Sequence, residues 1–201
     1  WIQIVVTFSA TTATIYLNGS DITTDSSIGA VVDNSLPIWV GEVSGGASGT
    51  STDFKGKIDE IGIWNEALTA NEITALYNSG VALDARTNLG DYTSTGNLKG
   101  YWKMEDGSGT TLTDVSGYGN DGTINGATLA NDRFGNDNSA YFFDGENDFI
   151  DIGVGLLGND QSVSMSLWVQ SGLEENPFEG EIYISYDRVK NNASQYNQSF
   201  Q

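Results

Sequence analysis

The sequence predicts an all-β sandwich with one short helix, and three observations lead to this prediction. Runs of β-branched and aromatic residues recur about every 8–12 residues, which is typical of antiparallel strands joined by turns. Turn-forming residues separate these runs, since the chain has 25 glycines and only 2 prolines. A single stretch has the period of an amphipathic helix, which excludes a parallel α/β fold with its many crossover helices.

The strand pattern is clearest near the start of the chain. Residues 2–8 are apolar and mostly β-branched, which indicates a buried strand. Residues 13–18 alternate in period two, and Asn18-Gly19 supplies a tight turn. Further strands are predicted over residues 36–43, 57–65, 99–104, 123–129, 139–143, 148–152, 162–170 and 181–187.

The predicted helix covers residues 70–79. Thr69 and Glu72 have the spacing of a capping box, in which each residue satisfies a backbone N–H at the helix start. An apolar stripe with i, i+3, i+4 spacing follows, made by Ile73, Leu76 and Tyr77. Gly80 is suited to end the helix. We expect a surface helix that closes one end of the sandwich.

Composition narrows the function classes. The chain carries 27 acidic and 8 basic residues, a formal net charge of −19, which repels nucleic acid and anionic membranes. It has no cysteine for disulfides and no histidine for acid–base catalysis or transition-metal binding. Any metal should therefore be a hard cation on oxygen ligands, with Ca²⁺ first. No apolar run approaches the ~18 residues of a membrane span, so no membrane insertion is expected.

Two signatures stand in an unexpected order. Residues 54–69 have the pattern that ends a β-sandwich domain, whereas residues 98–109 have the pattern that begins one. The chain also begins at Trp1 without a methionine, and its last residues continue a strand-like pattern. We therefore expect a piece cut from a tandem array, truncated at both ends, in which no signal peptide is visible.

Both parts resemble one family, the bacterial type of laminin-G-like module within the concanavalin A-like lectin/glucanase superfamily. The segments that resemble the second half of such a module are residues 1–8, 15–19, 56–61 and 65–73. The segments that resemble its first half are residues 101–109, 114–122, 143–150 and 164–169. The resemblance implies a concanavalin A-like jelly-roll β-sandwich and spans most of the chain.

The same resemblance divides the chain into three parts. Residues 1–80 correspond to the C-terminal half of a module, residues 81–97 to a polar linker, and residues 98–201 to the N-terminal half of the next. The few strands between the two halves of a module are missing. The halves either pair as one circularly permuted sandwich that lacks these strands, or remain unclosed with apolar faces and strand edges exposed.

A structural calcium site is the predicted cofactor site. The resemblance implies that the Asp59 side chain and the carbonyl oxygens of Glu105 and Gly145 hold the Ca²⁺. Asp59 lies in the C-terminal half of one module, and the other two residues lie in the N-terminal half of the next. Several aspartates also lie in glycine-rich turns, where they could aim oxygens at a cation: Asp106, Asp114, Asp121, Asp144 and Asp148. The alternative is that these aspartates form turns by accepting hydrogen bonds from their own backbone.

Catalysis is not expected. Glycoside hydrolases of the superfamily use a Glu-x-Asp-x-x-Glu strand, which places its carboxylates on one face. Here Asp59 and Glu60 are adjacent and are predicted to point to opposite faces. Glu179 and Glu181 share a face, but the rest of the motif is absent.

The resemblance therefore implies a non-catalytic carbohydrate-binding or adhesion module of a secreted or surface multidomain protein, extracellular and bacterial. Its partner would be a polysaccharide or glycan, or another surface protein. The alternatives are a structural spacer or protein–protein adhesion repeat without sugar affinity, and a glycoside hydrolase.

Tyr118 is expected to be exposed, whereas the strand tryptophans are expected to pack in the core: Trp39, Trp64, Trp102 and Trp168. Two matches to the glycosylation pattern, at Asn192 and Asn197, are attributed to chance.

Overall fold

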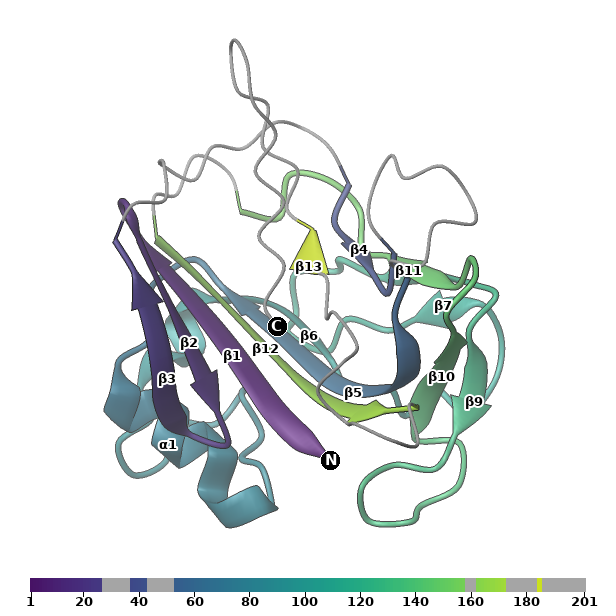
Figure 1. Ribbon diagram of the computed structural model, residues 1–201, viewed down its shortest axis with the longest axis horizontal. Helices are drawn as coiled ribbons and strands as arrows, with labels where there is room; N and C mark the ends of the chain where they lie inside the picture. Colours follow the sequence, from purple (N-terminus) through teal and green to yellow (C-terminus); the bar gives the residue numbers. More distant parts are fainter. Residues whose placement is uncertain (27–36, 43–52, 158–161, 173–183, 186–201) are drawn as a thin grey trace, which may run out of the picture.

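The computed structural model describes residues 1–26, 37–42, 53–157, 162–172 and 184–185. It confirms the predicted fold class, because antiparallel strands form two sheets and the described residues contain one α-helix (Figure 1). No described helix has both the length and the apolar character needed to cross a bilayer.

The larger sheet, sheet A, is made of strands from distant parts of the chain. Its strands are β1 (Ile2–Ser9), β2 (Thr12–Leu17), β3 (Ser20–Asp25), β5 (Lys55–Trp64), β6 (Leu98–Trp102), β9 (Thr128–Ala130), β10 (Ala140–Asp144) and β12 (Ser162–Ser171). They run in the order β3-β2-β1-β12-β5-β10-β9, and β6 also pairs with β5. Strands on both sides of residues 81–97 therefore share one sheet, with β5 between β12 and β10.

The smaller sheet, sheet B, faces sheet A. Its strands are β4 (Trp39–Val40), β7 (Thr111–Leu112), β8 (Gly122–Asn125), β11 (Phe149–Asp151) and β13 (Ile184–Ser185). They run in the order β13-β4-β11-β8-β7. Sequence analysis did not predict β3 or β7. Strand β3 is largely exposed and lacks an apolar face, and β7 lies within a turn-rich connection.

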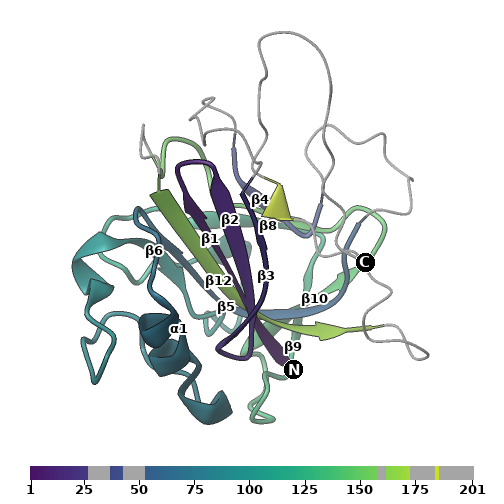
Figure 2. The same ribbon diagram turned by 60° about the vertical axis from the view of Figure 1, so that its left-hand side comes forward.

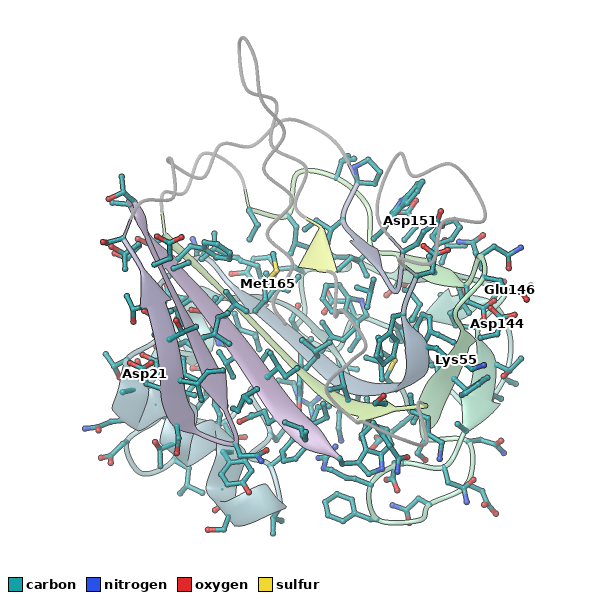
Figure 3. All side chains as sticks on the ribbon, viewed as in Figure 1. Asp21, Lys55, Asp144, Glu146, Asp151 and Met165 are labelled. Carbon is teal, nitrogen blue, oxygen red and sulfur yellow. The ribbon has the colours of Figure 1, made fainter. Side chains whose placement is uncertain are left out.

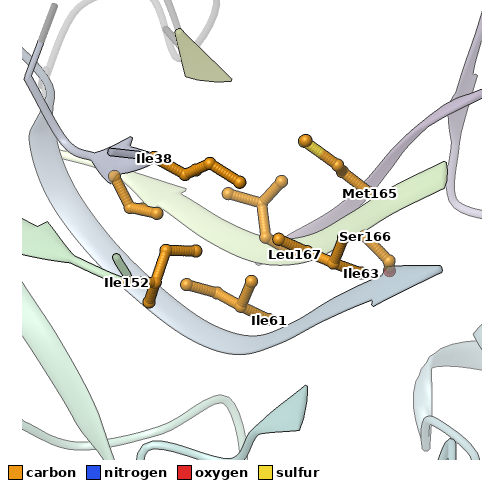
Figure 4. A pocket seen from close by; sticks show the side chains of 8 residues that line it. Ile38, Ile61, Ile63, Ile152, Met165, Ser166 and Leu167 are labelled. Atoms are coloured by element: carbon orange, nitrogen blue, oxygen red, sulfur yellow. The ribbon is translucent and has the colours of Figure 1, made fainter. Parts of the chain in front are cut away.

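The main core lies between the sheets. Residues from both sheets form it, and its large aromatic members are Phe54, Trp102, Tyr141 and Phe143. Figure 4 shows the apolar side chains around a cavity of about 10 Å³ in this layer. Such a volume holds at most one water molecule, so this cavity offers no room for a sugar.

A second core covers the outer face of sheet A. Helix α1 (Ala70–Tyr77) lies on the side of sheet A that faces away from sheet B (Figure 2). Ile73 and Leu76 of this helix pack with Val5 and Trp64 of the sheet. The apolar stripe predicted for the helix is therefore the face that it buries.

The predicted capping box is confirmed at the start of α1. Thr69 Oγ1 accepts a hydrogen bond from the Glu72 backbone N–H, and the Glu72 carboxylate accepts one from the Thr69 N–H. The helix ends at Tyr77, earlier than predicted, because Asn78 adopts a left-handed conformation with φ 45°. Asparagine tolerates this conformation better than most residues, so it replaces Gly80 as the stop.

Residues 81–97, predicted as a linker, pack against sheet A. Tyr92 is fully buried, and its hydroxyl donates to the Ala85 carbonyl (2.7 Å) and accepts from Trp64 Nε1 (2.9 Å). A short 3₁₀ helix, η2 (Ser94–Asn97), leads into β6. A polar sequence without periodicity predicts a linker, but a few anchoring side chains are enough to hold this segment on the sheet.

Candidate functional site

Two of the three residues predicted to bind calcium, Asp59 and Gly145, lie apart, whereas Glu105 is close enough to Asp59 to act on its charge. Asp59 is buried on β5, whereas Glu105 is exposed after β6, where it pairs with Lys103 (3.2 Å). Gly145 follows β10 and approaches Lys55. Because Asp144 lies opposite Lys55 in the sheet, Gly145 is roughly 13 Å along β5 from Asp59. The structure does not bring Asp59 and Gly145 together.

The side chain of the predicted ligand set, Asp59, already has a charged partner. The Asp59 carboxylate forms an ion pair with Arg133, and both side chains are buried. Within the part of the chain that the structure describes, no group of three or more acidic residues is arranged to hold a metal. The Ca²⁺ assignment stays a prediction, which thermal unfolding with Ca²⁺ and with chelator would test.

The turn aspartates act on their own backbone. Asp114 accepts hydrogen bonds from the N–H groups of Tyr101, Ser116 and Asn120 at 2.9–3.0 Å. The other four predicted turn aspartates also accept backbone N–H groups: Asp106, Asp121, Asp144 and Asp148. This is the arrangement expected of residues that stabilise turns.

Asp59 and Glu60 point to the same side of sheet A, and the prediction of opposite faces is wrong. The strand contains a β-bulge, since Gly62 pairs with Ser166 and Asp59 with Trp168, which leaves two residues of β5 opposite one of β12. Glu60 adopts a positive φ of 54° at this point. The bulge therefore breaks the alternation, and both carboxylates reach the guanidinium of Arg133.

The Arg133 cluster, which Arg133 forms with Asp59, Glu60, Tyr101 and Trp168, is largely buried. The Arg133 guanidinium lies 4.5 Å from the centre of the Trp168 ring, whose other neighbour is Tyr77 at 5.8 Å. Tyr101 donates its hydroxyl to Glu60. Burial raises the pKa of Asp59 to about 7, although the positive charge of Arg133 acts in the opposite direction. These contacts join the turn between β9 and β10 to the centre of sheet A.

The outer face of sheet B, unlike the Arg133 cluster, carries side chains that are exposed or half-buried. Along β4, β11 and β8 the inward residues Val40, Ile150 and Ile124 belong to the core. The residues next to them in the sequence point to the outside, where they are half-buried or exposed. Together with Thr111 of β7 they form what we call the sheet B platform: Thr111, Thr123, Asn125, Phe149, Asp151 and Trp39. Figure 3 shows Asp151 on this side of the molecule.

Two aromatic rings form the apolar part of the platform. The rings of Trp39 and Phe149 are 4.6 Å apart between centroids and tilted by 30°. Asp151 lies directly opposite Trp39 on the neighbouring strand, and Asn125 lies opposite Phe149. The arrangement joins a flat apolar surface to a carboxylate and an amide.

The tryptophans thus divide into two groups. Trp64, Trp102 and Trp168 are at most 3% exposed, as predicted for core residues. Trp39 is half-buried on an outer face, so the core prediction is wrong for this residue. Tyr118 is exposed as predicted. Other expectations, on Glu179, Glu181, Asn192 and Asn197, lie outside the described residues.

A family comparison covers the first part of the chain. Residues 1–74 match a laminin G-type family model described as the Concanavalin A-like lectin/glucanases superfamily. The matched range contains β1 to β5 and the beginning of α1, and the two-sheet sandwich is consistent with a concanavalin A-like fold. No curated protein and no solved structure gives a significant match to the chain. That residues 98–201 come from a second module stays a prediction.

Proposed function

We propose that the chain is a non-catalytic carbohydrate-binding module that holds a polysaccharide on the sheet B platform, within a secreted or surface protein. The observation that carries the proposal is the Trp39–Phe149 ring pair beside Asp151 and Asn125. Aromatic rings have electron-rich faces that attract the positively polarised C–H groups of a sugar ring. The carboxylate and amide can bind its hydroxyl groups.

The non-catalytic part of the proposal is supported by the carboxylates of β5. The carboxylates of Asp59 and Glu60 lie close together, but both are buried in ion pairs with Arg133. Glu60 also accepts a hydrogen bond from the Tyr101 hydroxyl. The Asp59 and Glu60 side chains are about 5% and 12% exposed, so a polysaccharide cannot reach them. Asp151 stands on the platform, where its Oδ1 accepts the Gly153 N–H (2.8 Å) and is thereby oriented.

Affinity electrophoresis in gels that contain neutral glucan, mannan, xylan or a uronate polymer tests this function. We expect retardation in at least one neutral polysaccharide. Replacing Trp39→Ala should weaken that binding about tenfold, since a stacked aromatic contributes about 0.5–1.5 kcal/mol beyond its buried area.

The matched control is Phe134→Ala, which removes an aromatic ring that is 56% exposed in the turn between β9 and β10. This variant should migrate as the wild type does. Equal retardation of the wild-type and Trp39→Ala proteins would contradict binding on the sheet B platform. Absence of retardation of the wild type in every gel would favour a spacer without sugar affinity. Release of reducing sugar from any of these polymers would contradict its non-catalytic part.

A further inference from the structure

The register of sheet B aligns polar and aromatic side chains into a straight row. Trp39 lies opposite Asp151, Asp151 opposite Thr123, and Thr123 opposite Thr111. These residues belong to four neighbouring strands, β4, β11, β8 and β7. Neighbouring strands are about 4.8 Å apart, so the row extends roughly 14 Å across the sheet.

Each member of the row has surface that is accessible from outside the sandwich, although the indole nitrogen of Trp39 is buried. Thr111 and Thr123 are exposed, and Asp151 and Trp39 are half-buried. Phe149 and Asn125 form a second, shorter row beside it, with Phe149 in contact with the Trp39 ring. The chemistry changes along the row, from an aromatic surface through a carboxylate to two hydroxyl groups.

We propose that the platform binds the interior of a linear, uncharged polysaccharide, whose chain runs across the strands from β4 to β7. This inference rests on the function proposed above. A single sugar would cover the indole of Trp39 alone, whereas a chain of about three sugars is needed to reach Asp151, Thr123 and Thr111. A platform that selected a chain end would need a closed wall, whereas among the described residues the row is built from open strand faces.

The charge around the row favours an uncharged chain. Asp151 lies within it. Asp144 and Glu146 lie on the same side of the molecule as Asp151, together with Lys55 (Figure 3). With a net charge of −19 for the whole chain, a uronate or sulfated polymer would meet repulsion.

The test is the dependence of affinity on oligosaccharide length. Oligomers from two to six sugars long, prepared from the neutral polysaccharide that retards the protein most, are titrated calorimetrically into the full chain. Affinity should rise about tenfold from the disaccharide to the tetrasaccharide and then level off, because the row is then covered. Reduction of the terminal sugar of the hexasaccharide should leave its affinity unchanged.

Variants locate the effect on the row. Thr123→Ala should weaken binding of the tetrasaccharide several-fold but leave the disaccharide unchanged. The matched control is Thr128→Ala, an exposed threonine on β9 of sheet A, which should change neither. Equal affinities for all lengths, or loss of binding after end reduction, would overturn the linear-chain inference while leaving sugar binding intact. Absence of binding to every polysaccharide would remove the proposed function as well.

Discussion

At the scale of single residues, Arg133 changes the role of two carboxylates. Asp59 and Glu60 resemble candidates for metal binding or catalysis in the sequence, but in the fold they neutralise one buried guanidinium. A buried ion pair of this kind is weak evidence for stability, but removal of one partner leaves an uncompensated charge. The aromatic neighbour Trp168 further shields the cluster from water.

The raised pKa of Asp59 predicts a specific pH dependence. Its folded pKa of about 7 exceeds the ordinary value of 3.8, so the contribution of this group to stability is full below about pH 4 and is lost as the pH rises through 7. Relative to Asp59→Asn, the wild type should therefore lose free energy of unfolding between pH 4 and pH 8. Urea unfolding at intervals across this range measures the difference.

The control for this experiment is Asp21→Asn, an exposed carboxylate on β3 at the edge of sheet A. This substitution removes an exposed carboxylate, so it measures the effect of a lost surface charge on the same unfolding curves. A difference between the wild type and Asp59→Asn that stays constant with pH would show that Asp59 is ionised throughout, held by Arg133.

At the scale of elements, Glu72 joins helix α1 to the segment that follows it. One carboxylate oxygen accepts from Thr69, and the other accepts from the Ser94 hydroxyl (2.5 Å) and from Thr93. Burial alone would raise the pKa of Glu72, but these hydrogen bonds outweigh it and lower the pKa. A residue that sequence analysis identifies as a cap is thus also a tertiary anchor for residues 81–97.

Replacing Glu72→Gln should destabilise the protein by about 2 kcal/mol, since a charged acceptor of several hydrogen bonds is lost from a buried position. The loss should shrink below pH 4, because a carboxylate with a lowered pKa contributes stability only while it is ionised. Thermal and urea unfolding measure it, and Glu146→Gln, an exposed glutamate, is the matched control. An equal effect of the two substitutions would contradict the anchoring role.

At the scale of the whole molecule, residues on the two sides of the 81–97 segment form one structural unit. Strand β5 pairs with β12, β10 and β6, and β1 pairs with β12. Both core clusters contain residues from before and after this segment. Neither part can therefore bury its apolar face without the other.

This arrangement predicts a single cooperative unfolding transition. Tryptophan fluorescence and far-UV circular dichroism should give coincident urea curves, as expected for one domain. Arg133→Met should lower the free energy of unfolding by about 3–5 kcal/mol, because it leaves two buried carboxylates without their positive partner. The variant should still unfold in one transition. Two separate transitions in the wild type would indicate independently folding parts.

Most of the local structure follows from the sequence alone. Positive φ values at both residues confirm the tight turn predicted at Asn18-Gly19. Few residue pairs adopt this conformation easily, so the pair alone predicts the turn. The capping box and the alternating strands are likewise properties of short segments. The sequence leaves two alternatives for the turn aspartates, and their hydrogen bonds to nearby backbone favour a role in forming turns.

Only the tertiary structure decided what the candidate site residues do. The partner of Asp59 is Arg133, far along the chain, and a one-residue bulge reverses the expected direction of Glu60. Trp39 has the sequence context of a core residue, but the register of β4 against β11 turns it outward beside Phe149. Composition and period determined that the chain forms a β-sandwich, since these depend on local preference and burial. Long-range strand register determined its surface, because a shift of one residue exchanges the two faces of a strand.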